Sequence, residues 1–345
     1  MRRSGLRGIL VLGLLLASLA LSLGLVPGGS EQVSAAGRAR SPHCHGVGYD
    51  QVQGDRPTYT RKRLGTYPNR RRACHAVWLP NPRRYLVPQG LAVTGRTAWI
   101  SGFRFREGYG ERPCHLVRVD LRTGRRLGYH AAVYGRVGHR PRTYCRHGGG
   151  LLQRGRWLWI AEKNRLWLVD PSRPGRVLDA RRVWRLRAPV RGSAIVATPR
   201  RIGLVPYQTS GRAHIYWFTR RLLFHRFVHD LGAHGRGVTQ LGAVARTRVP
   251  RFVQGATVDA RTRLFLTRSN LSCGELVTPS GRRLSFVPGA EGISFAAHDR
   301  RLWAVSESGA RPYVVSRKPL TPGVTSFEWP RLAGGLAPRC GFPRY

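Results

Sequence analysis

Two acidic residues stand close together near the end of the sequence, at the two ends of the segment EGISFAAHDRRLWAVSE, which runs from Glu291 to Glu307. A pair of carboxylates can transfer protons as general acid and base, and it can also bind a hard cation through its oxygen atoms. Acids are rare in this chain, which has 16 Asp and Glu against 60 Lys and Arg. The two glutamates are therefore the first candidates for a functional site.

The same segment is the clearest copy of an internal repeat, and the repeat predicts how the glutamates are positioned. Each copy has a Gly, an apolar run, a short polar turn and a second apolar run. The copies cover residues 88–102, 148–162, 191–208, 253–270 and 290–308, and their marker glycines are Gly90, Gly150, Gly192, Gly255 and Gly292.

From residue 84 onward, short apolar alternations are separated by Gly, Pro, Asp or Arg-rich turns, a pattern typical of an all-β protein. The distance between successive marker glycines is about the length of a β-propeller blade with four short antiparallel strands. We predict a propeller over residues 85–345 with five blades, and six as the alternative. Residues 36–84 form an irregular basic leader that could supply the sixth blade or one strand that closes the ring, with a strand candidate at 77–79.

In a propeller, the first strand of each blade begins, and the second strand ends, at the same mouth of the central channel. Polar groups that converge on such a concave mouth are the default candidates for a binding site; the alternative is that they cap strands and bind channel water. The residues that we predict to bind a ligand there are Gln89, His147, Arg191, Gln254, Asn270, Glu291 and Glu307. Ser101, Glu162, Tyr207 and Ser306 end second strands near the same mouth.

Two of these segments resemble known propeller families. The residues EGI at 291–293, followed by LWAVSE at 302–307, resemble a blade motif of the esterase-like phytase domain and the E-G-P motif of gluconolactonase-like propellers. The run PQGLAV at 88–93 resembles strands of NHL and streptogramin-lyase-like propellers. The gluconolactonase resemblance implies that Glu291 is a metal ligand, and Asn270 and Glu307 could complete a site for Ca²⁺ or Mg²⁺. The Asp-rich calcium sites of phytase propellers are absent from the sequence.

Other catalytic patterns are incomplete. His147 precedes three glycines, as in the oxyanion-hole motif of lipases, but no G-x-S-x-G follows anywhere in the chain. His147 could also act as the general base of a lyase, although the sequence identifies no partner acid. Arg and Trp alternate at 156–159, which suits nucleic acid or acidic glycans, but strand alternation with Trp packed between blades is the simpler explanation.

The N-terminus has the pattern of a secretory signal. Basic residues at positions 2, 3 and 7 precede an uncharged apolar run at 9–26, and VSA at 33–35 matches a cleavage site. We expect a signal peptide over residues 1–35 and a secreted or cell-surface bacterial protein, with an uncleaved anchor as the alternative. No second segment is apolar enough to span a membrane.

Six cysteines in an exported chain predict three disulfides, for which fifteen pairings are possible. Proximity in sequence favours pairing Cys44 with Cys74 and Cys114 with Cys145. Cys273 and Cys340 then remain to form the third disulfide. Structural zinc is disfavoured because the chain contains no C-x-x-C spacing.

The formal net charge of +44 falls only to +42 when residues 1–35 are removed, since they contain three Arg and one Glu. A field of this strength favours anionic partners. We therefore expect a monomeric, non-catalytic binding module for a wall polymer, an acidic glycan, extracellular nucleic acid or a small ligand at the channel mouth. The alternative function is a propeller enzyme, either a metal-dependent esterase or phosphatase or a lyase, with its site at that mouth.

Overall fold

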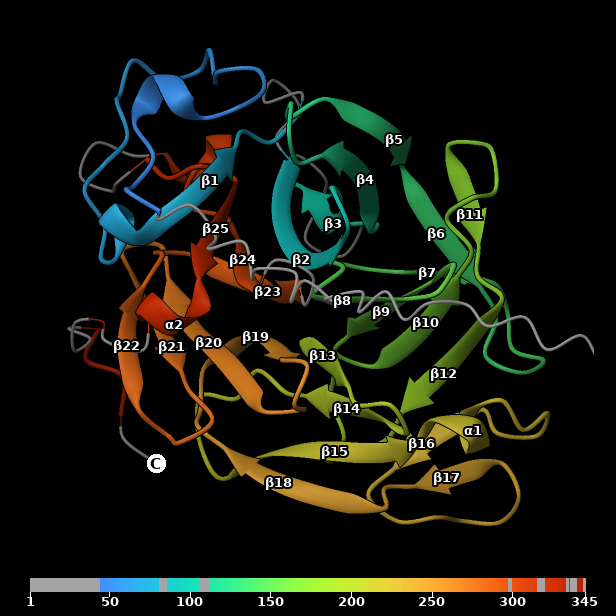
Figure 1. The fold of residues 1–345 in the computed structure, drawn as a ribbon. Helices are drawn as coiled ribbons and strands as arrows, with labels where there is room; N and C mark the ends of the chain where they lie inside the picture. The colour runs from blue at the N-terminus through green and yellow to red at the C-terminus, as the bar shows by residue number, and fades with distance from the viewer. Residues whose placement is uncertain are drawn as a thin grey trace, which may run out of the picture. The chain divides into compact units, whose positions relative to one another are not determined.

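The computed structural model describes residues 44–80, 86–105, 112–296, 300–314, 320–332, 335 and 340–343. The predicted signal peptide lies outside the described residues. Within them, regular structure is almost entirely β-strand, and five sheets surround a central channel (Figure 1). The chain is a five-bladed β-propeller, as the repeat predicted.

Each blade is an antiparallel sheet whose first strand lies at the channel. Blade 1 contains β2 (Leu86–Thr94), β3 (Thr97–Arg104), β4 (His115–Asp120) and β5 (Arg126–His130). Blade 2 contains β8 (Gly150–Arg154), β9 (Trp157–Glu162), β10 (Arg165–Val169) and β12 (Arg182–Leu186). Blade 3 contains β13 (Ala194–Ala197), β14 (Arg201–Val205), β15 (Ala213–Thr219) and β18 (Ala245–Val249). Blade 4 contains β19 (Val253–Val258), β20 (Leu264–Asn270), β21 (Cys273–Val277) and β22 (Arg283–Phe286).

Blade 5 combines a strand from the N-terminal part of the described chain with three strands from its C-terminal part. It contains β23 (Ala290–Ala296), β24 (Arg301–Ser306), β25 (Val324–Glu328) and, as its outermost strand, β1 (Ala73–Val77). Figure 1 shows β1 beside β25, and the pairing is antiparallel, with Val77 opposite Val324. The leader thus supplies one strand to this blade, at 73–77 rather than at the predicted 77–79.

Two further groups of strands lie outside the five four-stranded blades. Blade 2 extends outward through β16 (Asp230–Gly232) and β17 (Gln240–Gly242), which pair in parallel. A separate sheet contains β6 (Ala132–Gly135), β7 (Thr143–Tyr144) and β11 (Val177–Asp179). The described residues contain two single-turn α-helices, α1 (Arg220–Leu223) and α2 (Trp329–Leu332). In the described ranges, no helix is long and apolar enough to cross a membrane.

Apolar packing explains the alternation in the sequence. The inner strands line a channel cavity of about 140 Å³ with aliphatic side chains such as Leu91, Leu151 and Ile293. Between blades 2 and 3, Trp159 stacks on Trp184 at 5.5 Å between ring centroids, and both are buried. Leu158 and Trp159 are neighbours in β9 and both are buried, so this strand is covered on both faces, whereas Arg156 stands in the exposed turn before it.

The three predicted disulfides are confirmed. Their Cα atoms lie 4.5 Å apart for Cys44 and Cys74, 5.3 Å for Cys114 and Cys145, and 5.4 Å for Cys273 and Cys340.

Four of the five marker glycines lie where the inner strands of adjacent blades touch. A Cβ atom placed on Gly90 would lie 2.8 Å from the backbone nitrogen of Leu151, and one on Gly292 would lie 2.8 Å from that of Leu91. Gly150 and Gly255 meet the next blade in the same way. The fifth, Gly192, stands two residues before β13, so that copy of the repeat is displaced relative to the others.

Replacing Gly292 with Ala should destabilise the ring at the contact between blades 5 and 1. The new Cβ would meet backbone atoms of blade 1 at 2.8 Å, and backbone can move only if the two strands separate. Overpacking of this kind costs about 1–3 kcal/mol, which urea unfolding should detect. Gly128→Ala is the matched control, since a Cβ there would lie at an ordinary 3.6 Å from its neighbour; equal losses in both variants would contradict the packing argument.

Candidate active site at the channel mouth

Three inner strands carry a β-bulge at the residue before the marker glycine. Pairing with the second strand shifts between Pro88 and Gly90 in β2, between Val253 and Gly255 in β19, and between Ala290 and Gly292 in β23. The extra residues are Gln89, Gln254 and Glu291. A bulge turns its side chain away from the regular alternation and is common beside active sites. The inner strands of blades 2 and 3, β8 and β13, pair without such a shift.

These three side chains and Glu307 form one hydrogen-bonded line across blades 4, 5 and 1. The Nε2 atom of Gln254 donates to Oε1 of Glu291 at 2.9 Å. The carboxyl groups of Glu291 and Glu307 are hydrogen-bonded to each other. The Nε2 atom of Gln89 donates to Oε2 of Glu307 at 3.0 Å and to the Pro88 carbonyl at 3.1 Å. The two amides thus hold the outer oxygen atoms of a carboxyl pair.

The carboxyl pair retains a proton. Glu291 is 5% exposed, and burial is the main reason why its pKa is raised well above the usual value. The charge of Glu307 and the hydrogen bond to it raise the pKa of Glu291 further, while a hydrogen bond from Ser269 opposes the shift. Two hydrogen-bonded carboxyls cannot both ionise without strong repulsion. A charge on Glu307 therefore disfavours ionisation of Glu291, and Glu307, which is half-buried, is the more accessible of the two carboxyl groups.

An exposed aromatic residue stands beside the pair. Tyr207 follows β14 and is 45% exposed, and its backbone N–H donates to Oγ of Ser193 at 3.0 Å. Partial burial, and then the negative charge of Glu291, raise the pKa of Tyr207. The phenol therefore stays neutral and lies within electrostatic reach of the carboxyl pair.

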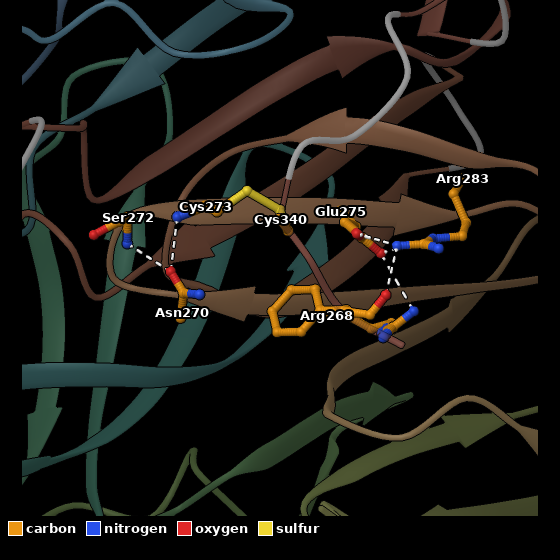
Figure 2. The surroundings of a disulfide bond; sticks show 8 residues. Arg268, Asn270, Ser272, Cys273, Glu275, Arg283 and Cys340 are labelled. Atoms are coloured by element: carbon orange, nitrogen blue, oxygen red, sulfur yellow. Dashed lines mark hydrogen bonds and ion pairs between the residues drawn. A yellow bond between two sulfur atoms is a disulfide. The ribbon is translucent and has the colours of Figure 1, made fainter. Parts of the chain in front are cut away.

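The other predicted ligand-binding residues do not join the hydrogen-bonded line. Arg191 donates from Nη1 to the carbonyl of its neighbour Val190. Asn270 is exposed, and its Oδ1 accepts from the backbone N–H groups of Ser272 and Cys273 at 2.9 Å each (Figure 2). Its side chain therefore closes the turn between β20 and β21.

His147 lies outside the line as well. Part of the residue is exposed, but its ring packs on Phe103 at 4.4 Å between centroids. Burial of the ring, with the positive charges of Arg112 and Arg146, lowers the pKa of His147 to about 4. The imidazole is therefore neutral at neutral pH. No carboxylate is among the groups that shift its pKa.

Glu162 reaches the end of its strand as expected but is fully engaged. It is 5% exposed and accepts hydrogen bonds from the backbone N–H of Arg146 at 2.7 Å, from Arg165 at 3.0 Å and from the indole of Trp167 at 3.2 Å. Three donors on one buried carboxyl indicate a role in holding the loop before β8.

The residues predicted to hold Ca²⁺ or Mg²⁺ do not fit a hard cation as they are placed. Such an ion takes several oxygen ligands at once, whereas the Asn270 oxygen accepts from backbone N–H groups of its own turn and does not join Glu291 and Glu307. In the part of the chain that the structure describes, no group of three or more His, Cys, Asp or Glu could hold a metal ion. The cation remains a prediction.

Known proteins are only distantly similar to this chain. No family model and no curated protein sequence matches the chain. Among solved structures, glutaminyl cyclase from Myxococcus xanthus is 11% identical, over 76% of this chain and 94% of that one, with a TM-score of 0.43. The calcium-binding protein regucalcin from Agrobacterium tumefaciens is 14% identical, over 70% and 89%, with a TM-score of 0.36. A luciferin-regenerating enzyme is 7% identical, over 74% and 94%, with a TM-score of 0.37. Similarity this low carries no information about activity.

Glu291→Gln should change how stability depends on pH. Because the pKa of Glu291 is raised above 4.5, the folded protein holds a proton that the unfolded chain releases above that pH. The stabilising contribution is complete below pH 4.5 and is lost as pH rises through the raised pKa. Glutamine cannot ionise, so the free energy of unfolding of the variant, relative to wild type, should increase as pH rises above 4.5 and through the raised pKa of Glu291.

Urea unfolding at a series of pH values measures this difference directly. The pKa values of His115 and His147 are lowered to about 4, so these two residues make stability rise with pH between about 4 and their unfolded pKa of 6.5. This contribution cancels in the comparison because wild type and variant both contain the two histidines. Glu328→Gln, which removes a carboxylate paired with Arg331 in the same blade, is the control. If the curves of wild type and Glu291→Gln run parallel, the two glutamates do not share a proton.

Proposed function

We propose that the protein is an exported enzyme that uses the Glu291–Glu307 pair for general acid–base catalysis at the channel mouth. The observation that carries the proposal is a buried carboxyl, with its pKa raised well above the usual value, hydrogen-bonded to a half-buried partner. Such a pair offers an acid and a base at the same pH. Strongly perturbed carboxyls in a concave site are typical of catalysis.

The direct contact between the two carboxyls narrows the reaction class. Glycoside hydrolases separate their carboxyls by about 5 Å or more, so that a sugar fits between them. Hydrogen-bonded carboxyls instead suit the addition of water to a carbonyl group. The ionised carboxylate takes a proton from water, whose oxygen bonds to the carbonyl carbon, while the protonated carboxyl gives its proton to the carbonyl oxygen. When the adduct collapses, the proton taken from water passes to the leaving group, the adduct returns its hydroxyl proton, and the pair again holds one proton.

Hydrolysis of a panel of neutral chromogenic esters and anilides tests this function. General acid–base groups contribute about 10²–10⁴-fold to rate, so Glu291→Gln and Glu307→Gln should each lower kcat/KM by at least about 100-fold. Glu328→Gln, outside the mouth, should retain the wild-type rate. Hydrolysis by the two mouth variants at the wild-type rate would refute the assignment, and so would a wild-type protein that hydrolyses no member of the panel.

A second candidate function, binding of an anionic polymer, is favoured by the charge of the chain. Lys and Arg exceed Asp and Glu by 60 to 16. Arg70 and Arg71 line a groove of about 900 Å³ beside β1, together with His45 and Gln51. In the described part of the chain, neither guanidinium has an ion pair or side-chain hydrogen bond, so both are available to a polyanion. A wall polymer, an acidic glycan or extracellular nucleic acid would supply such charges.

Salt-dependent elution from heparin resin tests this second function. Each charge pair lost should lower the slope of log affinity against log salt by about 1, so Arg70→Gln with Arg71→Gln should elute earlier and show a slope lower by about 2. The double variant Arg220→Gln with Arg221→Gln, which removes two adjacent arginines from α1, is the matched control. Elution that does not depend on salt, or equal losses in both double variants, would refute the groove as the binding site.

A further inference from the structure

An aromatic row continues outward from Tyr207 to the C-terminal segment. The ring of Phe252 meets that of Tyr207 edge-on, with centroids 6.1 Å apart and an interplanar angle of 78°. The ring of Phe342 stacks on Phe252, with centroids 5.6 Å apart. The central ring of the row Tyr207–Phe252–Phe342 stands two residues before Gln254, which donates to Glu291, and the row ends on a segment that is distant in sequence.

The backbone fixes Phe252 in this row. Phe252 directly precedes the inner strand of blade 4 and has a φ of +64°, in the left-handed region that residues with a side chain rarely adopt. Its N–H donates to the carbonyl of Gln208 at 2.9 Å, which ties it to the loop that carries Tyr207. A costly backbone conformation persists only where the surroundings enforce it, so the position of this ring is strongly determined.

A buried ionic cluster in blade 4 holds the C-terminal segment in place (Figure 2). Glu275 is fully buried and pairs with Arg268, which is itself 1% exposed, and with Arg283. Arg268 donates to the Pro343 carbonyl at 2.9 Å, and Arg283 donates to the Phe342 carbonyl at 3.2 Å. The guanidinium of Arg268 also lies 4.8 Å from the centroid of the Phe342 ring.

A covalent bond completes the attachment. The Cys273–Cys340 disulfide joins β21 to the C-terminal segment two residues before Phe342. Two arginines, one disulfide and one aromatic stack thus act on only four described residues, 340–343. These attachments set the position of the Phe342 ring, which is the outermost ring of the aromatic row.

We propose that Tyr207, Phe252 and Phe342 form a wall that seats the apolar ring of a neutral substrate and presents its carbonyl group to the carboxyl pair. Aromatic faces bind ring systems by stacking, and Tyr207 offers 45% of its surface for that contact. The negative charge of the pair repels an anionic group placed against it. Tyr207 contacts the substrate, whereas Phe342 is a positioning residue that acts through Phe252. This substrate class rests on the proposed acid–base function.

Binding of three small probes tests the wall without requiring turnover. Benzamide has a ring and a neutral carbonyl, isobutyramide lacks the ring, and benzoate replaces the amide with a carboxylate. Ligand-observed NMR at physiological salt should show benzamide binding at least about fivefold more tightly than either of the others, since ring stacking and charge repulsion each contribute on this scale. Tyr207→Ala and Phe342→Ala should each remove this preference.

Three further proteins separate the possible results. Phe227→Ala, at a 43%-exposed aromatic residue outside the row, should bind benzamide like wild type. Phe342→Leu preserves most of the volume and should lose only part of the preference, even if Phe342→Ala does not fold. Glu291→Gln should keep the preference for benzamide over isobutyramide while losing hydrolysis, so failure of the acid–base function is distinguishable from failure of the wall. Equal affinity of wild type for benzamide and isobutyramide, or undiminished preference in Tyr207→Ala, would refute the wall.

Discussion

The close contact between the inner strands of adjacent blades is the constraint on which this molecule depends. At Gly90, Gly150, Gly255 and Gly292 a Cβ atom would lie within 2.8 Å of the neighbouring strand, so no residue larger than Gly fits without displacing backbone. This contact brings the starts of five strands to one mouth. It also sets the distance over which side chains of different blades can form hydrogen bonds.

The candidate site depends on three bulges that stand immediately beside these contacts. A strand without a bulge would turn the residue before Gly to the opposite face. With it, amide groups from blades 1 and 4 reach the carboxyl pair of blade 5. Burying two carboxyls is costly unless they are paired and hydrogen-bonded, and here one proton and two amides satisfy them. The low exposure that makes burial of these carboxyls costly is also the main cause of the raised pKa of Glu291.

Other buried acids of the chain are paired with arginines. Glu162, Asp230 and Glu275 are buried acids that each contact at least one arginine, and Glu275 helps to fix the C-terminal segment. In a chain with so many arginines, the usual environment of a buried acid is cationic. The Glu291–Glu307 pair differs in that its hydrogen-bonding partners include another carboxyl and the neutral amides of Gln89 and Gln254.

The sequence by itself determined the fold and the disulfide pairing, and it predicted the two glutamates as candidate site residues. Those features depend on local sequence patterns: a Gly and two alternating apolar runs in each blade, and cysteines that lie near each other in the chain. The bulges, the shared proton, and the engagement of Asn270 and His147 elsewhere were decided by the tertiary structure alone. Gln89 and Glu307 are 218 residues apart in sequence. Phe342 is held near β21 by the disulfide between Cys340 and Cys273, the first residue of that strand. Such contacts depend on how the ring closes, and no local pattern of residue types encodes the register at which distant strands meet.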